Sequence, residues 1–396
     1  MKVFVTGFGI ISAIGNNVSE NLTSLIENKS GIEKAKFFES KFVDNLFFGE
    51  IKLSIDQLCE KTNRSISDGY SKTDLFAFIA FEEAIQMANL SLENLSSIHT
   101  ALISSSTVGG MAETDDLYND ANLLSEASIH LHSYGSGIHT VRLAREFGII
   151  GFTDTLNTAC SSSANAIMLG AKLIKAGKAK RVIVGGSDSL SKFTVNGFNS
   201  LQILSNRICK PLANDRDGLN LGEGAGYLVL ESSEVVGEKK IFAEIKGYGN
   251  SNDAYHPTAL SGEAKGVTLA MEQAIKSANL TPQDIDYINT HGTATQNNDE
   301  VELNGLKKLF GKITFYNSTK SYTGHTLAAA GVLEAIFSIL SINNNLLIKS
   351  LNCDNPIFKE NPPLTKNIYN FPVNHVLSNS FGFGGNCTSL IISRVG

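Results

Sequence analysis

Two hydrophobic patterns alternate along the chain: short runs dense in apolar and β-branched residues, and longer runs with apolar residues at helical spacing. Residues 3–5, 151–156 and 181–188 have the first pattern, which predicts strands. Residues 74–88 and 164–176 have the second, which predicts helices. One face of the first predicted helix carries five apolar residues: Leu75, Ile79, Ala80, Ala84 and Ile85. The alternation of strands and helices predicts a layered α/β fold.

The N-terminal strand leads into Gly7-Phe8-Gly9, which predicts a glycine turn followed by a helix. Gly7-x-Gly9 also resembles the start of a dinucleotide-binding fingerprint. However, Ser12 stands where the third glycine belongs, and no acidic residue follows a second strand at the required distance. A nucleotide site is therefore disfavoured. Residues 29–72 are polar and irregular, and we expect them to form surface structure.

One segment recurs at a constant offset of 190 residues. Residues 84–100 and 274–290 share seven identical positions out of 17, and each copy reads as helix, turn and strand. The constant offset favours duplication of a half-molecule over a chance αβ unit. A polar stretch at 231–240 lies between two apolar runs, where we place the boundary. The sequence thus predicts two halves, residues 1–235 and 236–396.

The composition narrows the class of protein. The 396 residues are 42% hydrophobic and carry a formal net charge of −6, which argues against a general nucleic-acid binder. The five cysteines form no C-x-x-C pair, so they indicate neither a disulfide framework nor a zinc motif. The N-terminus lacks the regions of a signal peptide, and we expect no segment to approach the length of apolar sequence needed to cross a bilayer. We therefore expect a soluble, cytoplasmic protein.

Cys160 lies in the stretch 157–164, between a predicted strand and a predicted helix. Free N–H groups and the positive end of the helix dipole gather at a helix start, where they stabilise a thiolate and lower the pKa of a cysteine. Most free cysteines are instead small buried hydrophobic residues. This stretch alone leaves both interpretations open.

Three further stretches carry candidate chemistry. His291 follows the strand predicted in the second repeat copy, and Lys320 and His325 lie close together, with Glu334 beyond them. The glycine-rich stretch 378–386 offers backbone N–H groups to an oxyanion. Two histidines, a lysine and a cysteine at such positions are hard to explain by packing, and their spacing matches no zinc site. Three other histidines are interpreted as polar groups of the surface or of a pocket: His130, His132 and His139.

In this order, the motifs resemble those of the elongating β-ketoacyl-[acyl-carrier-protein] synthases of the thiolase-like superfamily, over essentially the whole chain. The resemblance implies two pseudo-symmetric halves stacked as an α-β-α-β-α sandwich. It implies decarboxylative condensation of an acyl group with malonyl-acyl carrier protein in fatty acid elongation. It also implies no metal and no cofactor, because phosphopantetheine arrives on the acyl carrier protein. The expected assembly is a homodimer, or a heterodimer with a related subunit, without nucleic acid or membrane.

The resemblance also assigns roles by position. Cys160 matches the nucleophile that holds the acyl chain as a thioester. His291 and His325 match the pair that stabilises the malonyl-derived enolate, while Lys320 and Glu334 match a lysine and an acid beside them. The backbone N–H groups of Cys160 and Phe383 match an oxyanion hole, and Thr293 and Thr295 match contacts to the pantetheine arm. The acyl pocket and its gate are matched by Met111, Phe381 and Phe383. Arg207 and Lys210 match the docking surface for the carrier protein.

Related activities are weighed against the same motifs. A degradative thiolase is disfavoured because Phe383 stands where that enzyme has its second catalytic cysteine. His325 argues against the initiating synthases, which use Cys-His-Asn. Cys160 argues against a chain-length factor, which is a non-catalytic subunit of similar fold. Three departures leave the pathway open. They are the absence of proline from 112–148, Asn386-Cys387 in place of Thr-Asn, and a single basic residue in 65–72. A ketosynthase of a polyketide-like or aryl-polyene pathway therefore remains the alternative.

Overall fold

The computed structural model describes residues 1–396 and consists of two five-stranded halves joined edge to edge. The strand order across the joined sheet is β3-β2-β4-β5-β1-β6-β12-β11-β7-β8. The first half contains β1 (Val3–Ser12), β2 (Thr100–Ser105), β3 (Thr153–Leu156), β4 (Arg181–Asp188) and β5 (Gly224–Ser232). The second contains β6 (Ala243–Asn252), β7 (Tyr287–Asn289), β8 (Phe315–Asn317), β11 (His375–Phe381) and β12 (Asn386–Ser393).

The two halves are related by pseudo-symmetry about the seam between β1 and β6. Moving outward from the seam, the first two pairings of each half are antiparallel, and the next two are parallel. The seam itself consists of only two residue pairs, Phe4 with Glu244 and Val5 with Ala243. The predicted pair of pseudo-symmetric halves is confirmed.

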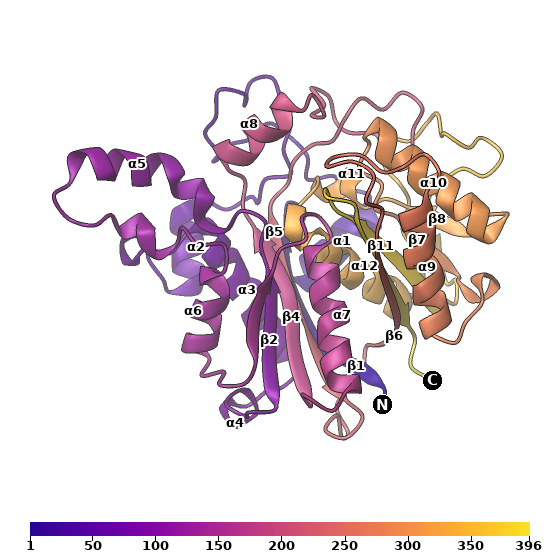
Figure 1. Ribbon diagram of the computed structural model, residues 1–396, viewed down its shortest axis with the longest axis horizontal. Coiled ribbons are helices and arrows are strands. Elements are labelled where there is room, and N and C mark those ends of the chain that lie inside the picture. Colours follow the sequence, from indigo (N-terminus) through magenta and orange to yellow (C-terminus); the bar gives the residue numbers. More distant parts are fainter.

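Helices form three layers around the two halves of the sheet (Figure 1). Alternate residues of a strand face opposite sides, so Val182 and Val184 of β4 pack in the central core, whereas Ile183 packs in the outer core. The predicted α-β-α-β-α sandwich is therefore confirmed. One outer layer contains α3 (Lys72–Met87) and α6 (Ile138–Glu146). The other outer layer contains α9 (Lys265–Ser277) and α10 (Gln296–Phe310). The central layer contains α7 (Ser162–Lys175) and α12 (Ala330–Asn344).

The glycine turn predicted near the N-terminus is wrong, because β1 continues through Gly7 and Gly9 to Ser12. A Cβ atom on Gly7 would lie 2.4 Å from the carbonyl oxygen of Ala84, and one on Gly9 would lie 2.1 Å from that of Ala80. These glycines therefore allow α3 to lie directly against β1, and they form no turn.

The second half repeats this contact. Gly247 and Gly249 of β6 lie against Ala274 and Ala270 of α9, with ideal Cβ positions 2.3 Å and 2.1 Å from the helix carbonyl oxygens. Ala274 is the repeat partner of Ala84, so the offset of 190 reflects the shared packing of these helices. The strands that follow these helices do not keep the offset of 190. The position that corresponds to the start of β2, Thr100, is Thr290, which lies just after the end of β7 at Asn289.

Two other sequence predictions differ from the structure. Residues 29–72 are not all irregular surface: they include α2 (Ile55–Thr62), and Phe48 and Leu58 are buried. The 18-residue stretch Leu327–Asn344 is long and apolar enough to cross a membrane, contrary to our expectation. It is 89% buried inside the protein, as the central layer requires.

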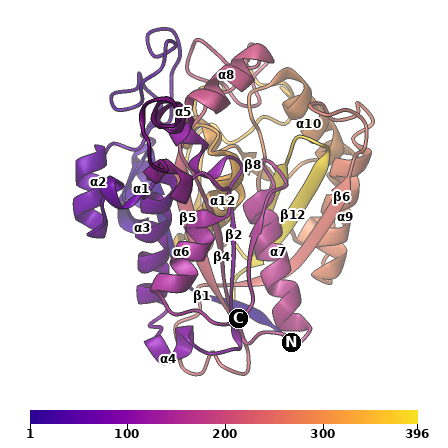
Figure 2. The same ribbon diagram turned by 60° about the vertical axis from the view of Figure 1, so that its left-hand side comes forward.

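The remaining elements connect these layers, and Figure 2 shows both chain ends at the same end of the molecule. The helix α5 lies on an arm that projects from the first half (Figure 1). These elements are α1 (Val18–Glu27), α4 (Leu92–Leu95), α5 (Thr114–Leu123), α8 (Lys192–Ser200), α11 (Lys320–Thr323), β9 (Leu346–Leu347) and β10 (Ile368–Tyr369).

Candidate active site

Cys160 lies in a tight turn between β3 and α7, close to the predicted strand and helix boundaries. The preceding residue, Ala159, has φ of 54°, a left-handed conformation that is strained for a residue with a Cβ atom. The Ser162 hydroxyl stabilises the turn, accepting a hydrogen bond from the Thr158 N–H at 2.8 Å and donating one to the Ala159 carbonyl at 2.5 Å. The turn thus holds a buried cysteine at the start of α7.

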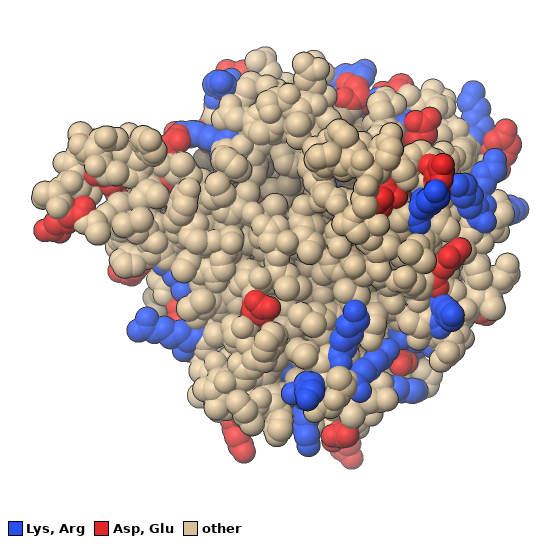
Figure 3. Space-filling model, viewed as in Figure 1, with Lys and Arg blue, Asp and Glu red and all other residues tan.

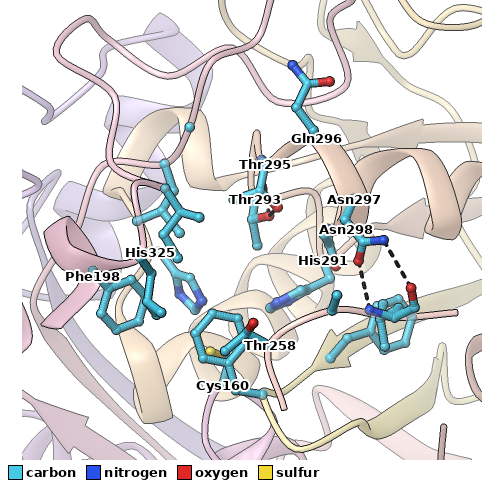
Figure 4. A pocket seen from close by; sticks show the side chains of 18 of the residues that line it. Cys160, Phe198, Thr258, His291, Thr293, Thr295, Gln296, Asn297, Asn298 and His325 are labelled. Carbon is cyan, nitrogen blue, oxygen red and sulfur yellow. Dashed lines mark hydrogen bonds between the residues drawn. The ribbon is translucent and has the colours of Figure 1, made fainter. Parts of the chain in front are cut away.

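The two predicted histidines meet Cys160 at one point. His291 follows β7, and His325 lies between α11 and α12. The sulfur of Cys160 and one nitrogen of each ring lie within 4.8 Å of one another. The imidazole rings are nearly perpendicular, with centroids 5.4 Å apart, and both face the sulfur (Figure 4). Three motifs that are far apart in sequence therefore form one cluster.

Hydrogen bonds at Nδ1 determine which ring nitrogen of each histidine carries the proton. Lys320 Nζ donates to Nδ1 of His291 at 3.2 Å, and the Leu327 N–H donates to Nδ1 of His325 at 3.3 Å. A nitrogen that accepts a hydrogen bond is unprotonated, so the neutral rings carry their proton on Nε2. The pKa of His291 lies well below its usual range because of burial, the charge of Lys320 and the neighbouring His325. The pKa of His325 is likewise lowered by burial and by the charge of Lys320. Both histidines are therefore neutral N–H donors at neutral pH.

Lys320 is held in place by a buried ion pair with Glu334 and by a 2.6 Å hydrogen bond to the His291 carbonyl oxygen. Burial raises the pKa of Glu334 to about 7, and the charge of Lys320 opposes that shift. Removing one partner of a buried ion pair costs about 3–5 kcal/mol, because the other charge is left without compensation. The pair thus fixes the ammonium against His291.

Two backbone N–H groups, those of Phe383 and of Cys160 itself, act on the Cys160 sulfur and lower the pKa of its thiol. Phe383 lies in the glycine-rich loop, where Gly384 and Gly385 adopt φ of 83° and 82°, which glycine tolerates best. The predicted lowering of the Cys160 pKa is wrong. Burial raises the pKa of the thiol to about 11 and outweighs the opposing effects of Lys320 and of these N–H groups.

A cavity of about 340 Å³ leads to Cys160 and both histidines. Thr293 and Thr295 line it and hydrogen-bond to each other through their hydroxyls at 2.9 Å. Phe381 and Phe383 also line it: the Phe381 ring contacts His291 with a centroid distance of 5.7 Å, and the Phe383 ring stacks on Phe198. The predicted pantetheine contacts and gate residues therefore lie on one channel.

Other predicted site residues lie elsewhere. Met111 lies in a 3-10 turn at the base of the α5 arm and does not line this cavity. Arg207 is exposed and makes two hydrogen bonds to one carboxylate oxygen of Asp217, a residue of the cavity wall. Lys210 pairs with Asp215 at 2.5 Å. Each of these two cations is therefore paired with a carboxylate, and Figure 3 shows Lys, Arg, Asp and Glu side chains intermingled at the upper end of the face that it presents.

The sequence did not single out the acidic residues that hold the His291 loop. Glu302 accepts hydrogen bonds from the N–H groups of His291 and Gly292, each at 2.9 Å, and Asp299 accepts one from Thr293 at 2.8 Å. Burial raises the pKa of Glu302 to about 7. A usable signal is the three-residue spacing of Asp299 and Glu302, which places both on the inner face of α10.

Asp188 was also missed, and it connects the two halves beside His325. Its buried carboxylate accepts hydrogen bonds from the hydroxyls of Ser106 and Thr107, each at 2.6 Å, and from the N–H of Ala328 at 2.8 Å. An acidic residue at the end of an apolar strand is the signal that sequence analysis could have used.

Two groups of side chains lie close enough together to share a metal ion. In the cluster of Cys160 with His291 and His325, each histidine presents a protonated Nε2, and the Lys320 ammonium lies beside His291, so this arrangement suits an anion better than a cation. The second group is partly exposed and consists of Glu113, Asp116 and His130.

The three additional histidines lie in different environments. His130 is half-buried and His132 is exposed. His139 differs from its prediction as a surface or pocket group, because it is 2% exposed and contacts the Ser104 hydroxyl through Nε2 at 2.8 Å. Burial lowers the pKa of His139 to about 4. It is therefore a neutral residue of the interior.

Comparisons with known proteins agree on a single family. Residues 1–235 match the model of the β-ketoacyl synthase N-terminal domain, and residues 242–354 match that of the C-terminal domain. The 3-oxoacyl-[acyl-carrier-protein] synthase 2 of Coxiella burnetii is 31% identical, over 100% of this chain and 99% of that relative.

Solved structures give the same fold over the whole chain. The ishigamide ketosynthase/chain length factor has a TM-score of 0.93 and 26% identity, covering 100% of this chain and 99% of that one. The ketosynthase ApeO of Xenorhabdus doucetiae, solved in complex with its chain length factor ApeC, has a TM-score of 0.86 and 30% identity, covering 100% and 98%.

Proposed function

This chain belongs to the β-ketoacyl synthase family, and we propose that the cluster around Cys160 is where it condenses an acyl group with malonyl-acyl carrier protein in fatty acid elongation. The products are a β-ketoacyl-acyl carrier protein and carbon dioxide. The observation that carries the proposal is the meeting of one sulfur with two neutral imidazole donors.

In the first half-reaction, the Cys160 sulfur attacks the thioester carbonyl of the acyl carrier protein. The N–H groups of Cys160 and Phe383 stabilise the oxygen that becomes negative in the tetrahedral intermediate. The pantetheine sulfur then leaves with the proton that the thiol gives up, and the acyl group remains on Cys160 as a thioester. The buried site protects this thioester from water.

In the second half-reaction, malonyl-acyl carrier protein enters the same cavity and loses carbon dioxide. The Nε2–H groups of His291 and His325 donate to the thioester oxygen, which becomes an enolate oxygen. The enolate carbon attacks the acyl carbonyl on Cys160, a carbon–carbon bond forms, and the bond to sulfur breaks. The released thiolate takes up a proton, which restores the thiol.

The carrier protein supplies the phosphopantetheine arm, so the proposed reaction needs no cofactor of the enzyme. We assign Thr293 and Thr295 as the groups that bind the amides of the arm, because both lie on the cavity wall above the histidines. Phe381 and Phe383 would form the gate, and Met111 would contribute to the acyl pocket from outside this cavity. Arg207 and Lys210 remain the proposed docking residues.

A second candidate is a ketosynthase of a polyketide-like or aryl-polyene pathway. The high structural similarity to ketosynthases solved with chain length factors favours it. In that case the partner would be a related subunit in a heterodimer, whereas the fatty acid function fits a homodimer. We place the enzyme in the cytoplasm in both cases.

The function is tested with purified protein, malonyl-acyl carrier protein and acyl-carrier substrates that are either saturated or polyunsaturated. Formation of β-ketoacyl-acyl carrier protein with release of carbon dioxide is the expected result. A preference for saturated chains supports fatty acid elongation, whereas a preference for polyunsaturated chains supports the second candidate. No condensation with either series would contradict the proposal.

A further inference from the structure

The side chain of Asn386 lies where the Cys160 turn meets the glycine-rich loop that carries Phe383. Its Oδ1 accepts hydrogen bonds from the Ser161 hydroxyl and from the Asn165 amide, both at 2.8 Å. Ser161 directly follows Cys160, and Asn165 lies in the first turn of α7. One oxygen of Asn386 therefore contacts two residues that follow the nucleophile, and both of these residues also contact Thr158, which precedes it.

The same oxygen also accepts hydrogen bonds from the second half of the molecule. Asn250 Nδ2 of β6 donates at 3.1 Å and Thr388 Oγ1 of β12 at 3.2 Å. An amide oxygen has two lone pairs, so these contacts are shared among four donors. Asn165, on α7, also accepts from Asn250 through its own Oδ1, and the single hydroxyl proton of Thr388 is shared between this oxygen, at 2.9 Å, and that of Asn386. The result is a closed polar network between the two halves.

The main chain of Asn386 closes the loop that contains Phe383. Its carbonyl oxygen accepts a 2.8 Å hydrogen bond from the Gly382 N–H. A Cβ atom on Gly382 would lie 2.4 Å from the carbonyl oxygen of Thr158, so the loop touches the nucleophile turn through its backbone. Asn386 thus holds the loop through its main chain and the turn through its side chain.

We propose that Asn386 is a positioning residue that holds the Phe383 N–H and the Cys160 sulfur at the separation needed to stabilise the oxyanion during acyl transfer. The inference rests on the proposed function for the identity of the reaction. The histidines are held by other contacts, from Lys320, Glu302 and Leu327. Loss of Asn386 should therefore affect acyl transfer and spare decarboxylation.

The first test is Asn386→Leu, which keeps the branching of the side chain but removes the acceptor. Acyl transfer to Cys160 is expected to fall by about 10²-fold, since a misplaced donor has an effect of that order. Malonyl decarboxylation is measured in a Cys160→Ala background with and without Asn386→Leu, and it should change by less than about 3-fold. Equal losses in both half-reactions, or none in either, would overturn the proposal.

Asn386→Asp tests whether the hydrogen-bond acceptor matters, because aspartate keeps an acceptor oxygen at this position and leucine does not. A carboxylate accepts from the same donors, and its negative charge is tolerated at the start of α7, where the helix dipole is positive. Acyl transfer should therefore be at least about 10-fold faster than with Asn386→Leu. If the two variants are equally slow, an acceptor at this position is not what matters.

A milder variant covers the case in which Asn386→Leu does not fold. Ser161→Ala removes one donor from the turn, and transfer should fall by about 10-fold with decarboxylation unchanged. The matched control is Asn367→Leu, at an asparagine that bonds Leu25 and Ile26 away from the cavity. It should leave both half-reactions as they are, and a loss of transfer there would contradict a specific role of Asn386.

Alkylation of Cys160 by iodoacetamide gives a readout that needs no acyl substrate. Because the Phe383 N–H helps to stabilise the thiolate, Asn386→Leu should slow alkylation at a fixed pH, and Asn367→Leu should not. If the wild-type protein alkylates normally but performs neither half-reaction, the proposed function fails. The alkylation rates then still decide whether Asn386 positions the loop, and equal rates would refute that role.

Discussion

The ammonium of Lys320 donates a hydrogen bond to Nδ1 of His291 at 3.2 Å, and this contact makes the opposite ring nitrogen a donor toward Cys160. Lys320 therefore acts on the enolate through His291, and its charge also lowers the pKa of Cys160. It keeps the imidazole neutral and fixes its tautomer.

Replacing Lys320 should slow decarboxylation and also destabilise the folded protein, because Glu334 loses its buried partner. Lys320→Met leaves Nδ1 of His291 without a donor and Glu334 without a partner. We expect decarboxylation to fall by about 10²-fold. Glu334→Gln, which leaves the contact between Lys320 and His291 possible, should be milder. Decarboxylation rates and melting temperatures of the two variants check this, and a Glu334→Gln protein slower than Lys320→Met would contradict it.

Cys160→Ala should abolish condensation, because no other cysteine lies beside the two histidines. Mass spectrometry after incubation with acyl-acyl carrier protein should find one acyl adduct, on Cys160. Cys209 and Cys353 are also buried and serve as internal controls that should remain unmodified. An adduct on either, or condensation by the variant, would disprove the assignment of the nucleophile.

His291→Ala and His325→Ala should each slow decarboxylation by about 10²-fold or more, since both rings donate to the enolate oxygen. Acyl transfer should suffer less, because its oxyanion has backbone donors. The two half-reactions are measured separately, with carbon dioxide release reporting one and acylation of Cys160 the other. Loss of transfer with intact decarboxylation would mean that the histidines serve the acyl oxyanion instead of the enolate.

The buried histidines also predict how stability depends on pH. In the folded protein the pKa values of His291 and His325 lie well below 6.5, whereas in the unfolded chain they return to about that value. Below pH 6.5 the unfolded chain therefore binds protons that the folded chain does not. Stability should be full above that pH and fall below it, by up to about 1.4 kcal/mol per pH unit for each histidine.

Urea unfolding at pH 7.5, 6.5 and 5.5 tests this dependence. His325→Gln removes one of the histidines whose pKa is lowered on folding, so its loss of stability between pH 6.5 and 5.5 should be smaller than that of the wild-type protein. Identical losses in the two proteins would mean that His325 does not titrate differently in the folded and unfolded states.

The two paired cations Arg207 and Lys210 give a prediction for docking. Arg207→Glu combined with Lys210→Glu removes two cations and adds repulsion toward an acidic carrier protein. KM for the carrier-bound substrate should rise, with much less effect on a short pantetheine thioester, and high salt should shrink the difference. Lys276→Glu, exposed on α9, is the matched control. Equal damage with both substrates would indicate a defect of the active site.

The sequence by itself determined which segments become strands and helices around the site and which side chains belong to its chemistry. The turn at Cys160 was predicted from an apolar strand pattern followed by a helical one, and local periodicity is sufficient for that. The duplication was visible because the same helix, packed on the same pair of strand glycines, occurs in both halves. The local pattern failed at Gly7 and Gly9, where contact with α3 decides the conformation.

Only the tertiary structure decided the electrostatic state of the site. The pKa of Cys160 depends on how deeply the turn is buried, and burial outweighs the helix start that sequence reasoning relied on. Asp217 and Asp215 pair with Arg207 and Lys210, and this could not be predicted because the geometry of side-chain contacts is absent from the sequence pattern. The contacts of Asn386 with both halves depend in the same way on how distant segments pack, and packing also determines the tautomers of the two histidines.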